Sequence, residues 1–314
     1  MKKYAFGVDI GGTTVKMGLF EKDGTLVSKW DIVTTKDNNG EKILPDIAAS
    51  LKKKMEEEGL TSEDIEGVGV GVPGAIDSEG KLVGNAANLG WVEKDIRKEL
   101  SDLMGGLKTV VANDANVAGY GEMWAGGAKG YTSVCMVTLG TGVGGGIIID
   151  GNILAGATGA GGEIGHICVN PDETESCGCG LKGCLEMYAS ATGIVRLAKR
   201  RLAKDDAPSV LRKDDISAKT VFDGVKNNDA VCKEVATEFG RILGKGLGSL
   251  ASVINPEIFV IGGGVSKAGS VLLDYVVDEF KKNTINACRN TKFALATLGN
   301  DAGIIGAAGL ILNK

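Results

Sequence analysis

Three cysteines and the only histidine are the residues whose types and spacing most clearly indicate chemistry. Cys177, Cys179 and Cys184 are separated mainly by glycines that let the chain fold around an ion, and His166 precedes them. Three thiolates and an imidazole are a common tetrahedral ligand set for structural zinc. The alternative is three buried, reduced thiols beside an unrelated histidine, but the tight clustering disfavours it. The pattern therefore predicts a closed zinc site rather than a catalytic metal.

The predicted zinc site would also hold two carboxylates in place. The ion would pin residues 161–168 and 177–186, which carry Glu163 and Glu186. A zinc-bound imidazole leaves its second ring nitrogen available for another bond. We interpret the remaining thiols as buried small hydrophobic side chains; they are Cys135, Cys168, Cys232 and Cys288.

Two glycine-rich turns, at residues 9–16 and 139–144, each separate two apolar runs. Such turns expose successive backbone N–H groups and small hydroxyls, which suit phosphate oxygens. No P-loop pattern occurs, and the Gly-x-Gly-x-x-Gly stretches at 69–74 and 140–145 do not open a helix as a dinucleotide site requires. The alternative is tight turns that simply need glycine. The candidate phosphate-binding residues are Gly11, Gly12, Thr13, Thr14, Gly140, Thr141 and Gly142.

Three charged residues lie where expected strands meet expected turns or helices. Asp9 ends a strand, which places it well to hold Mg²⁺ through water. Lys16 either neutralises phosphate or is an ordinary surface lysine on an alternating strand, and its position favours the surface. Asp114 follows a short strand and opens a helix, so by position alone it is first a helix N-cap and second a catalytic carboxylate.

One pattern of strands occurs twice along the chain. Apolar runs at 4–10, 14–20 and 26–32 are followed by similar runs at 134–139, 143–149 and 152–155. The Asp-Gly turns at residues 23 and 150 give an offset of 127 residues (150 − 23). The alternative is two hairpins that happen to look alike, but the repeated Gly-Thr turn favours a duplicated unit.

The remaining segments read as strands that lead into helices, which is typical of mixed α/β sheets. We expect strands at 65–72, 109–112, 257–261 and 292–297 and helices at 41–58, 93–104, 185–202, 218–226, 230–253 and 302–312, with further helices after 113 and after 264. No Pro-, Ser- or charge-rich linker separates the halves, so we expect them to abut around a cleft. Charged helix faces such as 52–58 and 199–204 read as solvated surface.

The composition excludes several classes of protein. The chain has 314 residues, 49 glycines, 43% hydrophobic residues, a formal charge of −5 and seven cysteines. The hydrophobic content excludes disorder, the absence of a Gly-x-y period excludes collagen, and the acidic balance disfavours nucleic-acid partners. An odd, clustered set of cysteines is not a secreted disulfide framework. The longest apolar tract, 134–149, is too short and glycine-rich to span a membrane, so we expect a cytoplasmic protein.

Two hairpin turns facing each other across a duplicated cleft resemble the nucleotide clamp shared by actin, sugar kinases and chaperone ATPases. The Gly262–Gly264 triplet resembles the element of that superfamily that lies against adenosine. The whole chain also resembles the ROK family of repressors and sugar kinases, and within it the bacterial glucokinases. The motifs that carry the resemblance are Asp9-Ile-Gly-Gly-Thr, Gly71-Val-Pro-Gly74, Asn113-Asp-Ala-Asn-Val117, Leu139-Gly-Thr-Gly-Val-Gly-Gly, Gly162-Glu-Ile-Gly-His166 and Cys177–Glu186.

The resemblance implies a duplicated actin-like, hexokinase-like ATPase fold with two α/β domains around a cleft. A small domain of residues 1–113, joined by the C-terminal helix 302–314, would face a large domain of residues 114–301 that carries the zinc loop. Asp114 would be the general base. The implied sugar-binding residues are Gly74, Asn88, Asn113, Asp114, Glu163, His166 and Glu186. The implied nucleotide-binding residues are Asp9, Gly11, Gly12, Thr13, Thr14, Lys16, Gly140, Thr141, Gly142, Gly263 and Gly264, and the zinc ligands are His166, Cys177, Cys179 and Cys184.

The expected activity is transfer of phosphate from ATP, with Mg²⁺, to the 6-hydroxyl of glucose. Residues 88–91, Asn-Leu-Gly-Trp, resemble the glucokinase version of a sugar-contacting loop. The alternatives that the resemblance leaves open are a kinase for another hexose, namely N-acetylmannosamine, fructose or allose, and a sugar-responsive transcriptional regulator of the same family that lacks its DNA-binding domain. Because the first phosphate loop begins at Asp9, we expect a kinase rather than a repressor, with no nucleic-acid or membrane partner. The family also implies a homodimer or tetramer.

Overall fold

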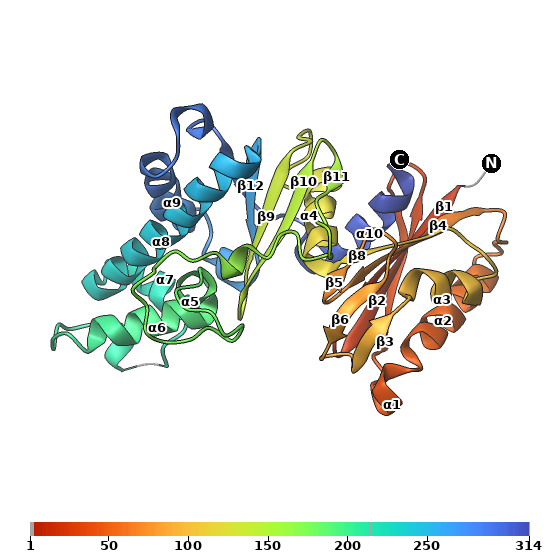
Figure 1. Cartoon of the computed structure of the whole chain (residues 1–314), viewed down its shortest axis with the longest axis horizontal. Coiled ribbons are helices and arrows are strands. Elements are labelled where there is room, and N and C mark those ends of the chain that lie inside the picture. The colour runs from red at the N-terminus through yellow and green to blue at the C-terminus, as the bar shows by residue number, and fades with distance from the viewer. Residues whose placement is uncertain (1–2, 214, 314) are drawn as a thin grey trace. The chain divides into compact units, whose positions relative to one another are not determined.

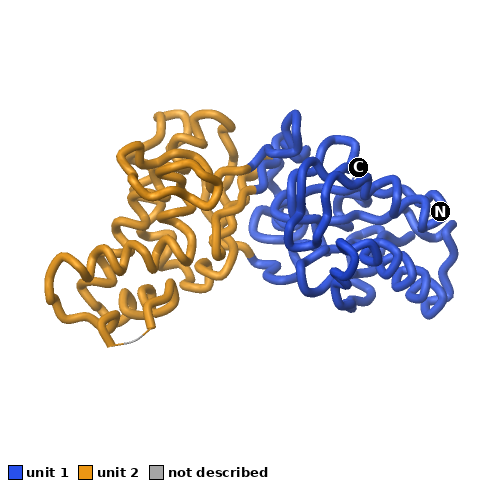
Figure 2. Tube along the Cα trace, turned by 60° about the horizontal axis from the view of Figure 1, so that its bottom comes forward, with its two compact units in different colours: residues 1–132, 146–162, 297–314 blue, residues 133–145, 163–296 orange. Residues whose placement is uncertain are grey.

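A computed structural model describes residues 3–213 and 215–313 of the chain. These residues form two compact units, coloured separately in Figure 2. The first contains residues 1–132, 146–162 and 297–314, and the second contains residues 133–145 and 163–296. The first unit extends beyond the expected boundary at residue 113 because helix α4 (Asp114–Ala125) packs against helix α10 (Ala302–Leu312).

The first sheet has five strands in the order β3-β2-β1-β4-β8. Strand β2 runs antiparallel to both β1 and β3, whereas β4 is parallel to β1, and β8 is parallel to β4. The strands are β1 (Tyr4–Ile10), β2 (Thr14–Glu21), β3 (Leu26–Val33), β4 (Ile65–Val72) and β8 (Thr109–Asn113). The hairpins form where the Gly-Gly-Thr and Asp-Gly turns interrupt the apolar runs, as the sequence predicts.

The second sheet repeats this order as β11-β10-β9-β12-β13. Strand β12 is again parallel to β9, and β13 is parallel to β12. The strands are β9 (Val134–Leu139), β10 (Val143–Ile149), β11 (Asn152–Ile153), β12 (Ile258–Gly262) and β13 (Lys292–Leu295). The same order in both sheets confirms the duplication predicted from the repeated hairpin.

Helices cover both faces of the first sheet (Figure 1). On one face, the apolar side of α2 (Ile43–Glu57) and the start of α3 (Ile96–Leu103) join the core formed by Phe6, Val8 and Ile10. On the other face, α10 packs on β1 and β4, and α4 packs on α10. A Cβ atom at Gly7 would lie 1.9 Å from the Ile304 carbonyl oxygen. The backbone of α10 can lie this close to the sheet because the strand has glycine, without a side chain, at this position.

The second unit carries the remaining helices. They are α5 (Glu186–Ala189), α6 (Ala191–Leu202), α7 (Ala218–Lys226), α8 (Ala230–Ile254) and α9 (Val271–Lys282). The long α8 packs against α6, α7 and α9, and Phe222 and Phe239 meet edge to face between α7 and α8. Short 3₁₀ turns lie at Ile164–His166, Val210–Arg212, Gly264–Ala268, Asn286–Cys288 and Gly299–Asp301. No helix within residues 3–213 and 215–313 is both long and apolar enough to cross a membrane.

Several elements differ from the sequence predictions. After β4, a segment for which the sequence predicted no structure forms a small antiparallel sheet. Its strands are β5 (Ala75–Ile76), β6 (Leu82–Ala86) and β7 (Trp91–Lys94). A short helix, α1 (Asp37–Gly40), precedes α2. The helix expected from residue 93 begins at Ile96 because Asp95 caps it. The helix expected over 185–202 is two helices, since Ser190 accepts a hydrogen bond from the Gly193 N–H and starts α6. The segment after Gly264 begins as a 3₁₀ turn before α9.

Candidate functional site

The four predicted zinc ligands meet at one point in the second unit. Their ligand atoms all lie within 4.8 Å of one another. Cys179 Sγ lies 3.7 Å from Cys184 Sγ, and Cys177 Sγ lies 3.8 Å from His166 Nδ1. A tetrahedral zinc ion with bonds of about 2.3 Å requires its ligand atoms to be separated by about 3.8 Å. The donor set and its spacing therefore fit a structural zinc ion.

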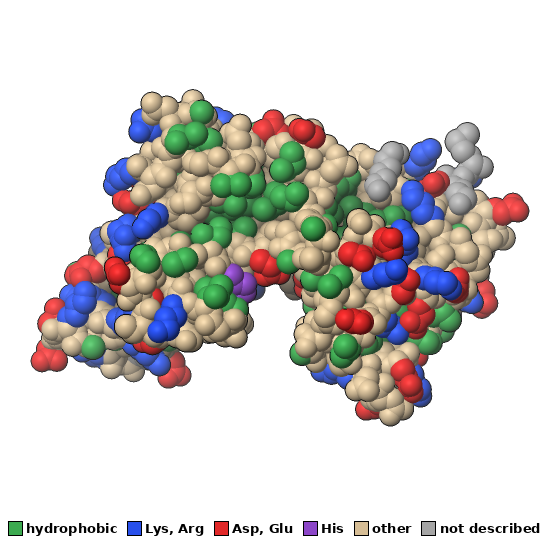
Figure 3. Space-filling model, viewed as in Figure 1, with side chains coloured by type: hydrophobic (Ala, Val, Ile, Leu, Met, Phe, Trp, Pro, Cys, Tyr) green, Lys and Arg blue, Asp and Glu red, His purple; other side chains and the backbone are tan. Residues whose placement is uncertain are grey.

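The second nitrogen of His166 faces away from the cysteines. His166 Nε2 lies 3.9 Å from a carboxylate oxygen of Glu163, and the imidazole reaches the molecular surface (Figure 3), with 32% of its side chain exposed. The ring can thus serve the metal through Nδ1 and a ligand through Nε2. The prediction that Cys168 is buried is wrong: it is an exposed residue on a short β-bridge to Cys184, whereas Cys135, Cys232 and Cys288 are buried.

Glu186 connects the metal cluster to the second glycine-rich turn. One carboxylate oxygen lies 3.4 Å from Cys177 Sγ, and the other accepts a hydrogen bond of 3.0 Å from the Val143 N–H. A Cβ atom at Gly142 would lie 2.1 Å from that second oxygen. Glycine is therefore required at 142 for Glu186 to reach the turn, and the turn and the metal cluster share one carboxylate.

The turn at Gly140–Gly142 is also held by the start of α6. The Ala191 N–H donates to Gly140 O at 2.8 Å, and the Thr192 hydroxyl donates to Thr141 O at 2.8 Å. A Cβ atom at Gly263 would lie 2.5 Å from Leu139 O, so the glycine triplet packs directly beside this turn. A cavity of about 320 Å³ opens between the turn and the metal loop. Its lining includes Thr141, Gly142, Cys177, Glu186, Thr192 and Arg196.

In the first unit, the turn at Gly11–Thr14 is closed by its own backbone and by a neighbouring strand end. The Gly11 N–H donates to Thr14 O at 3.0 Å, and the Thr34 hydroxyl donates to Gly11 O at 2.7 Å. Asn88, predicted as a sugar ligand, is exposed beside this turn, since a Cβ atom at Gly12 would lie 3.3 Å from the Asn88 Cβ. The structure thus places a predicted sugar residue next to a predicted phosphate loop.

Asp9 lies at the end of β1, opposite Lys16 of β2. Burial raises the pKa of Asp9 above its ordinary value of 3.8, and the charge of Lys16 opposes that rise. A Cβ atom at Gly303 would lie 2.5 Å from the Asp9 carboxyl carbon, so the first turn of α10 packs on this carboxyl group. Lys16 is half-buried, and its Nζ donates to the Asn300 carbonyl at 3.2 Å. The predicted surface position of Lys16 is therefore only partly correct.

Asn113, rather than Asp114, is the N-cap of α4. The Asn113 Oδ1 accepts hydrogen bonds from the Ala115 and Asn116 N–H groups, and its Nδ2 donates to Gly74 O at 3.0 Å. Asp114 is the first residue of the helix and is exposed. The N-terminal end of a helix favours a carboxylate. The cap interpretation of Asp114 is thus wrong, and its carboxylate is presented at the surface of the first unit.

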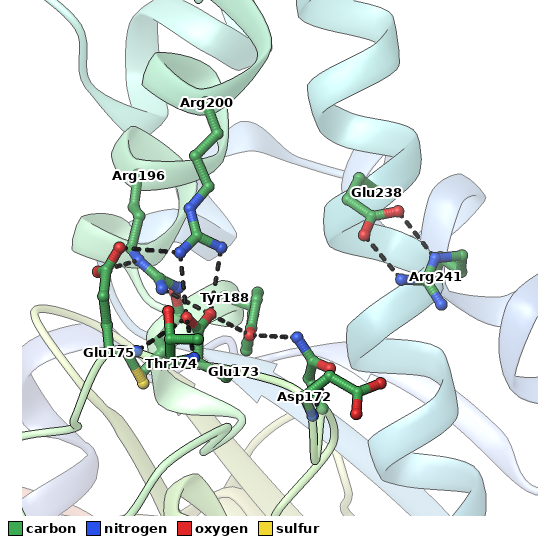
Figure 4. Close-up of polar contacts among 11 residues, drawn as sticks. Asp172, Glu173, Thr174, Glu175, Tyr188, Arg196, Arg200, Glu238 and Arg241 are labelled. Atoms are coloured by element: carbon green, nitrogen blue, oxygen red, sulfur yellow. Dashed lines mark hydrogen bonds and ion pairs between the residues drawn. The ribbon is translucent and has the colours of Figure 1, made fainter.

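A buried carboxylate in the second unit was not recognised in the sequence. Glu173, with 3% of its side chain exposed, accepts hydrogen bonds from Tyr188, Arg196 and Arg200 (Figure 4). Arg200 belongs to the 199–204 run that was interpreted as solvated surface, and it is exposed, although its guanidinium also binds Glu173 and Glu175. Arginines four residues apart on α6 and the nearby pair of glutamates were the available signal.

The Glu173 cluster predicts a pH-dependent contribution to stability. Hydrogen bonds from Arg200 hold the pKa of Glu173 well below its ordinary value of 4.5. A lowered carboxyl pKa stabilises the fold above the ordinary value, and the benefit is lost as the pH falls through the folded-state value. Urea unfolding of the native chain and Glu173→Gln should differ by about 2 kcal/mol at pH 7, and the difference should shrink between pH 5 and pH 3. A difference that does not change with pH would contradict this assignment.

Comparisons with known proteins agree with the sequence resemblance. The profile of the ROK family matches residues 5–314. The glucokinase of Halalkalibacterium halodurans is 40% identical over 314 residues, which cover 98% of this chain and 95% of that protein. The ROK hexokinase from Thermus thermophilus has a TM-score of 0.80 at 30% identity, covering 97% of this chain and 96% of that chain. A ROK family glucokinase from Streptomyces griseus, solved in complex with glucose and AMPPNP, has a TM-score of 0.74 at 35% identity, covering 98% of both chains.

Proposed function

Because the chain belongs to the ROK family and is a hexose kinase with that family's mixed α/β fold, we propose that it phosphorylates glucose at the 6-hydroxyl with ATP as donor. The observation that carries the choice of glucose is the similarity, over nearly the full chain, to a glucokinase solved with glucose and an ATP analogue. The products would be glucose 6-phosphate and ADP. Such a transfer depends mainly on positioning and charge neutralisation, with one carboxylate near the nucleophile.

Asp114 is the proposed general base. Its carboxylate would take the proton of the 6-hydroxyl while the sugar oxygen forms its bond to the γ-phosphorus and the bond to the ADP oxygen breaks. Two observations support this role: Asp114 is exposed, and it is the first residue of α4, directly after the end of β8. The strand β8 and the capped start of α4 fix the backbone on both sides of the carboxylate.

The proposed sugar ligands belong to both units. Amide and carboxylate groups suit a sugar because they form hydrogen bonds with several hydroxyls. The exposed Nε2 of His166 beside Glu163 supports their role as one contact, and the Glu186 carboxylate beside the Gly142 turn supports a second. The full proposed set is Gly74, Asn88, Asn113, Asp114, Glu163, His166 and Glu186.

The two glycine-rich turns are the proposed phosphate-binding loops. Mg²⁺ bound with ATP would neutralise phosphate charge, and the Asp9 carboxylate would hold its water ligands. Lys16, opposite Asp9 in the sheet, supplies a positive charge at the same strand end. Gly263 and Gly264 offer the nucleotide a surface without side chains, and a Cβ atom at Gly264 would meet open space.

The cysteine and histidine cluster is proposed to hold a structural zinc ion. The ion would cross-link the chain around His166 with the chain around Cys177 and Cys184, and so order the loop that leads to Glu186. We expect about one zinc per chain in the purified protein, measured by elemental analysis after removal of loosely bound metal. Replacing Cys179 with serine should lower that content and the stability together. A native chain that carries and binds no zinc would refute this assignment.

The substrate is tested by an assay across a panel of hexoses, in which ADP release is coupled to NADH oxidation. Glucose should have the highest kcat/KM, because the loop containing Asn88 resembles that of glucokinases. The panel includes N-acetylmannosamine, fructose and allose, since other family members are kinases for these sugars. A preference for any of them would replace glucose while retaining the kinase assignment, and turnover of none would contradict the proposed function. Polyphosphate and ADP are tested as alternative donors in a separate assay that detects glucose 6-phosphate with its dehydrogenase and NADP⁺, because neither donor releases ADP.

A further inference from the structure

The segment that contains Glu173 runs between two parts of the metal cluster. This segment, residues 169–175, is flanked by two isolated β-bridges. Cys168 pairs with Cys184 before the segment, and Ser176 pairs with Lys182 after it. The Val169 N–H donates to Gly183 O at 2.8 Å at the start of the segment. Glu173 lies near the middle of this segment, four residues before Cys177, a proposed metal ligand.

The carboxylate of Glu173 binds this segment to the two neighbouring helices, α5 and α6. Tyr188 of α5 donates to Glu173 Oε2 at 2.5 Å, and Arg196 of α6 donates to the same oxygen at 2.6 Å. Arg200, one turn further along α6, donates at 3.1 Å to each oxygen. The same carboxylate also accepts the N–H groups of residues 174 and 175, so it shapes its own loop while it binds the helices (Figure 4).

Glu175 binds the same two arginines of α6. It accepts hydrogen bonds from Arg196 Nε at 3.0 Å and from Arg200 Nη2 at 2.9 Å. Among the described residues, the buried charged side chains are Glu122 and Glu173. Burying a charge is costly unless its hydrogen bonds are complete. The geometry of Glu173, with donors on all sides, therefore fixes the loop in one arrangement.

The helices bound by Glu173 carry groups of the proposed active site. Tyr188 follows Glu186 by two residues on α5, and Glu186 binds the Gly142–Val143 turn. Arg196 lines the 320 Å³ cavity that also contains Thr141, Cys177 and Glu186. Glu173 and Glu175 thus help to fix the guanidinium of Arg196, which also donates to the Met187 carbonyl at 3.4 Å.

We infer that Glu173 is a positioning residue that holds Cys177 in the metal cluster and Glu186 beside the phosphate-binding turn, by attaching residues 172–176 to α5 and α6. Its effect on the metal follows from the cluster geometry alone. Its effect on catalysis rests on the proposed function.

The metal arm of the test compares zinc retention in two variants of the full chain. Glu173→Gln removes the buried charge, whereas Glu238→Gln removes a carboxylate that pairs with Arg241 on the exposed side of α8 (Figure 4). Zinc transfer from the folded protein to a chromogenic chelator should be about 10-fold or more faster in Glu173→Gln, because supporting residues of metal sites have effects of this size. Glu238→Gln should transfer zinc at the native rate.

The kinetic arm separates positioning from general stability. In Glu173→Gln the KM for glucose should rise several-fold, with a smaller change in kcat, because Glu186 would bind sugar less well while Asp114 lies in the other unit.

Tyr188→Phe, which deletes one hydroxyl, should shift zinc transfer and KM in the same direction by less, and it provides the test if Glu173→Gln does not fold. A variant of reduced unfolding free energy that keeps native zinc transfer and native KM would overturn the inference. A native chain that phosphorylates no hexose would refute the proposed function, and the zinc measurement would still decide the role of Glu173.

Discussion

Replacing Asp114 with asparagine is expected to lower kcat by about 10²- to 10⁴-fold, the usual contribution of a general base. Asparagine has nearly the shape of aspartate but cannot accept the proton of the sugar hydroxyl. Binding of glucose, measured by titration calorimetry without ATP, should change by no more than a few-fold. A loss confined to kcat is the signature of an interaction made in the transition state.

The local structure makes this substitution conservative. The start of α4 is capped by Asn113, whose Oδ1 accepts two backbone N–H groups, and that cap stays intact in Asp114→Asn. The variant loses the negative charge of one carboxylate at a helix N-terminus, a contribution of about 0.3–1 kcal/mol. Urea unfolding should therefore show nearly native stability, so that the kinetic loss cannot be attributed to misfolding.

Asp95→Asn is the matched control. Asp95 is also an acidic residue at a helix start in the first unit, where it accepts a hydrogen bond from the Lys98 N–H at 3.1 Å. Asparagine caps a helix about as well as aspartate, so this variant should keep native kcat and stability. Turnover close to native in Asp114→Asn would rule out Asp114 as the base.

The sequence predicted the two sheets well because each hairpin has a strong local signal. An apolar run, a Gly-Thr turn and an Asp-Gly turn occur together in both halves, and the shared strand order follows from them. The sheet of β5–β7 was not predicted, because its strands are short and largely exposed: Val83 is 41% exposed and Val92 is 72% exposed. Strands with so little buried surface have no hydrophobic periodicity to recognise.

The candidate site shows the same division between local and long-range signals. The cluster of three cysteines and one histidine was predictable because its cysteines are close in the sequence and their chemistry is specific. The break at Ser190 was missed, since it depends on a side-chain hydrogen bond that apolar periodicity does not record. The ion pair of Arg200 with Glu173 was missed because the two residues lie 27 positions apart in the sequence.

The glycines on β1 and β4 were equally unexplained by the sequence, and α10 supplies the reason. Gly7 and Gly69 are register partners on adjacent parallel strands. A Cβ atom at Gly69 would lie 1.8 Å from the Ala307 carbonyl oxygen of α10, and one at Gly7 would lie 1.9 Å from that of Ile304. The helix backbone thus rests directly on the sheet, at a distance that leaves no space for a methyl group.

Gly69→Ala should therefore destabilise the first unit by about 3 kcal/mol or more, at the upper end of the range for overpacking. The methyl group meets backbone atoms, which cannot rotate away as a flexible side chain can. Alanine also reduces the entropy of the unfolded chain, which favours folding by about 0.4–1 kcal/mol, but this gain is smaller than the cost of moving α10. Urea unfolding followed by circular dichroism measures the difference.

Gly71→Ala is the matched control on the same strand, because its Cβ atom would meet Val117 at an ordinary contact distance of 3.5 Å. We expect its stability to stay close to native, and a Gly69→Ala protein as stable as Gly71→Ala would contradict the packing argument. The displacement should also reach the nucleotide site, since the first turn of α10 packs through Gly303 on the Asp9 carboxyl group. The KM for Mg-ATP should then rise in Gly69→Ala, because the group proposed to hold the Mg²⁺ waters loses its support.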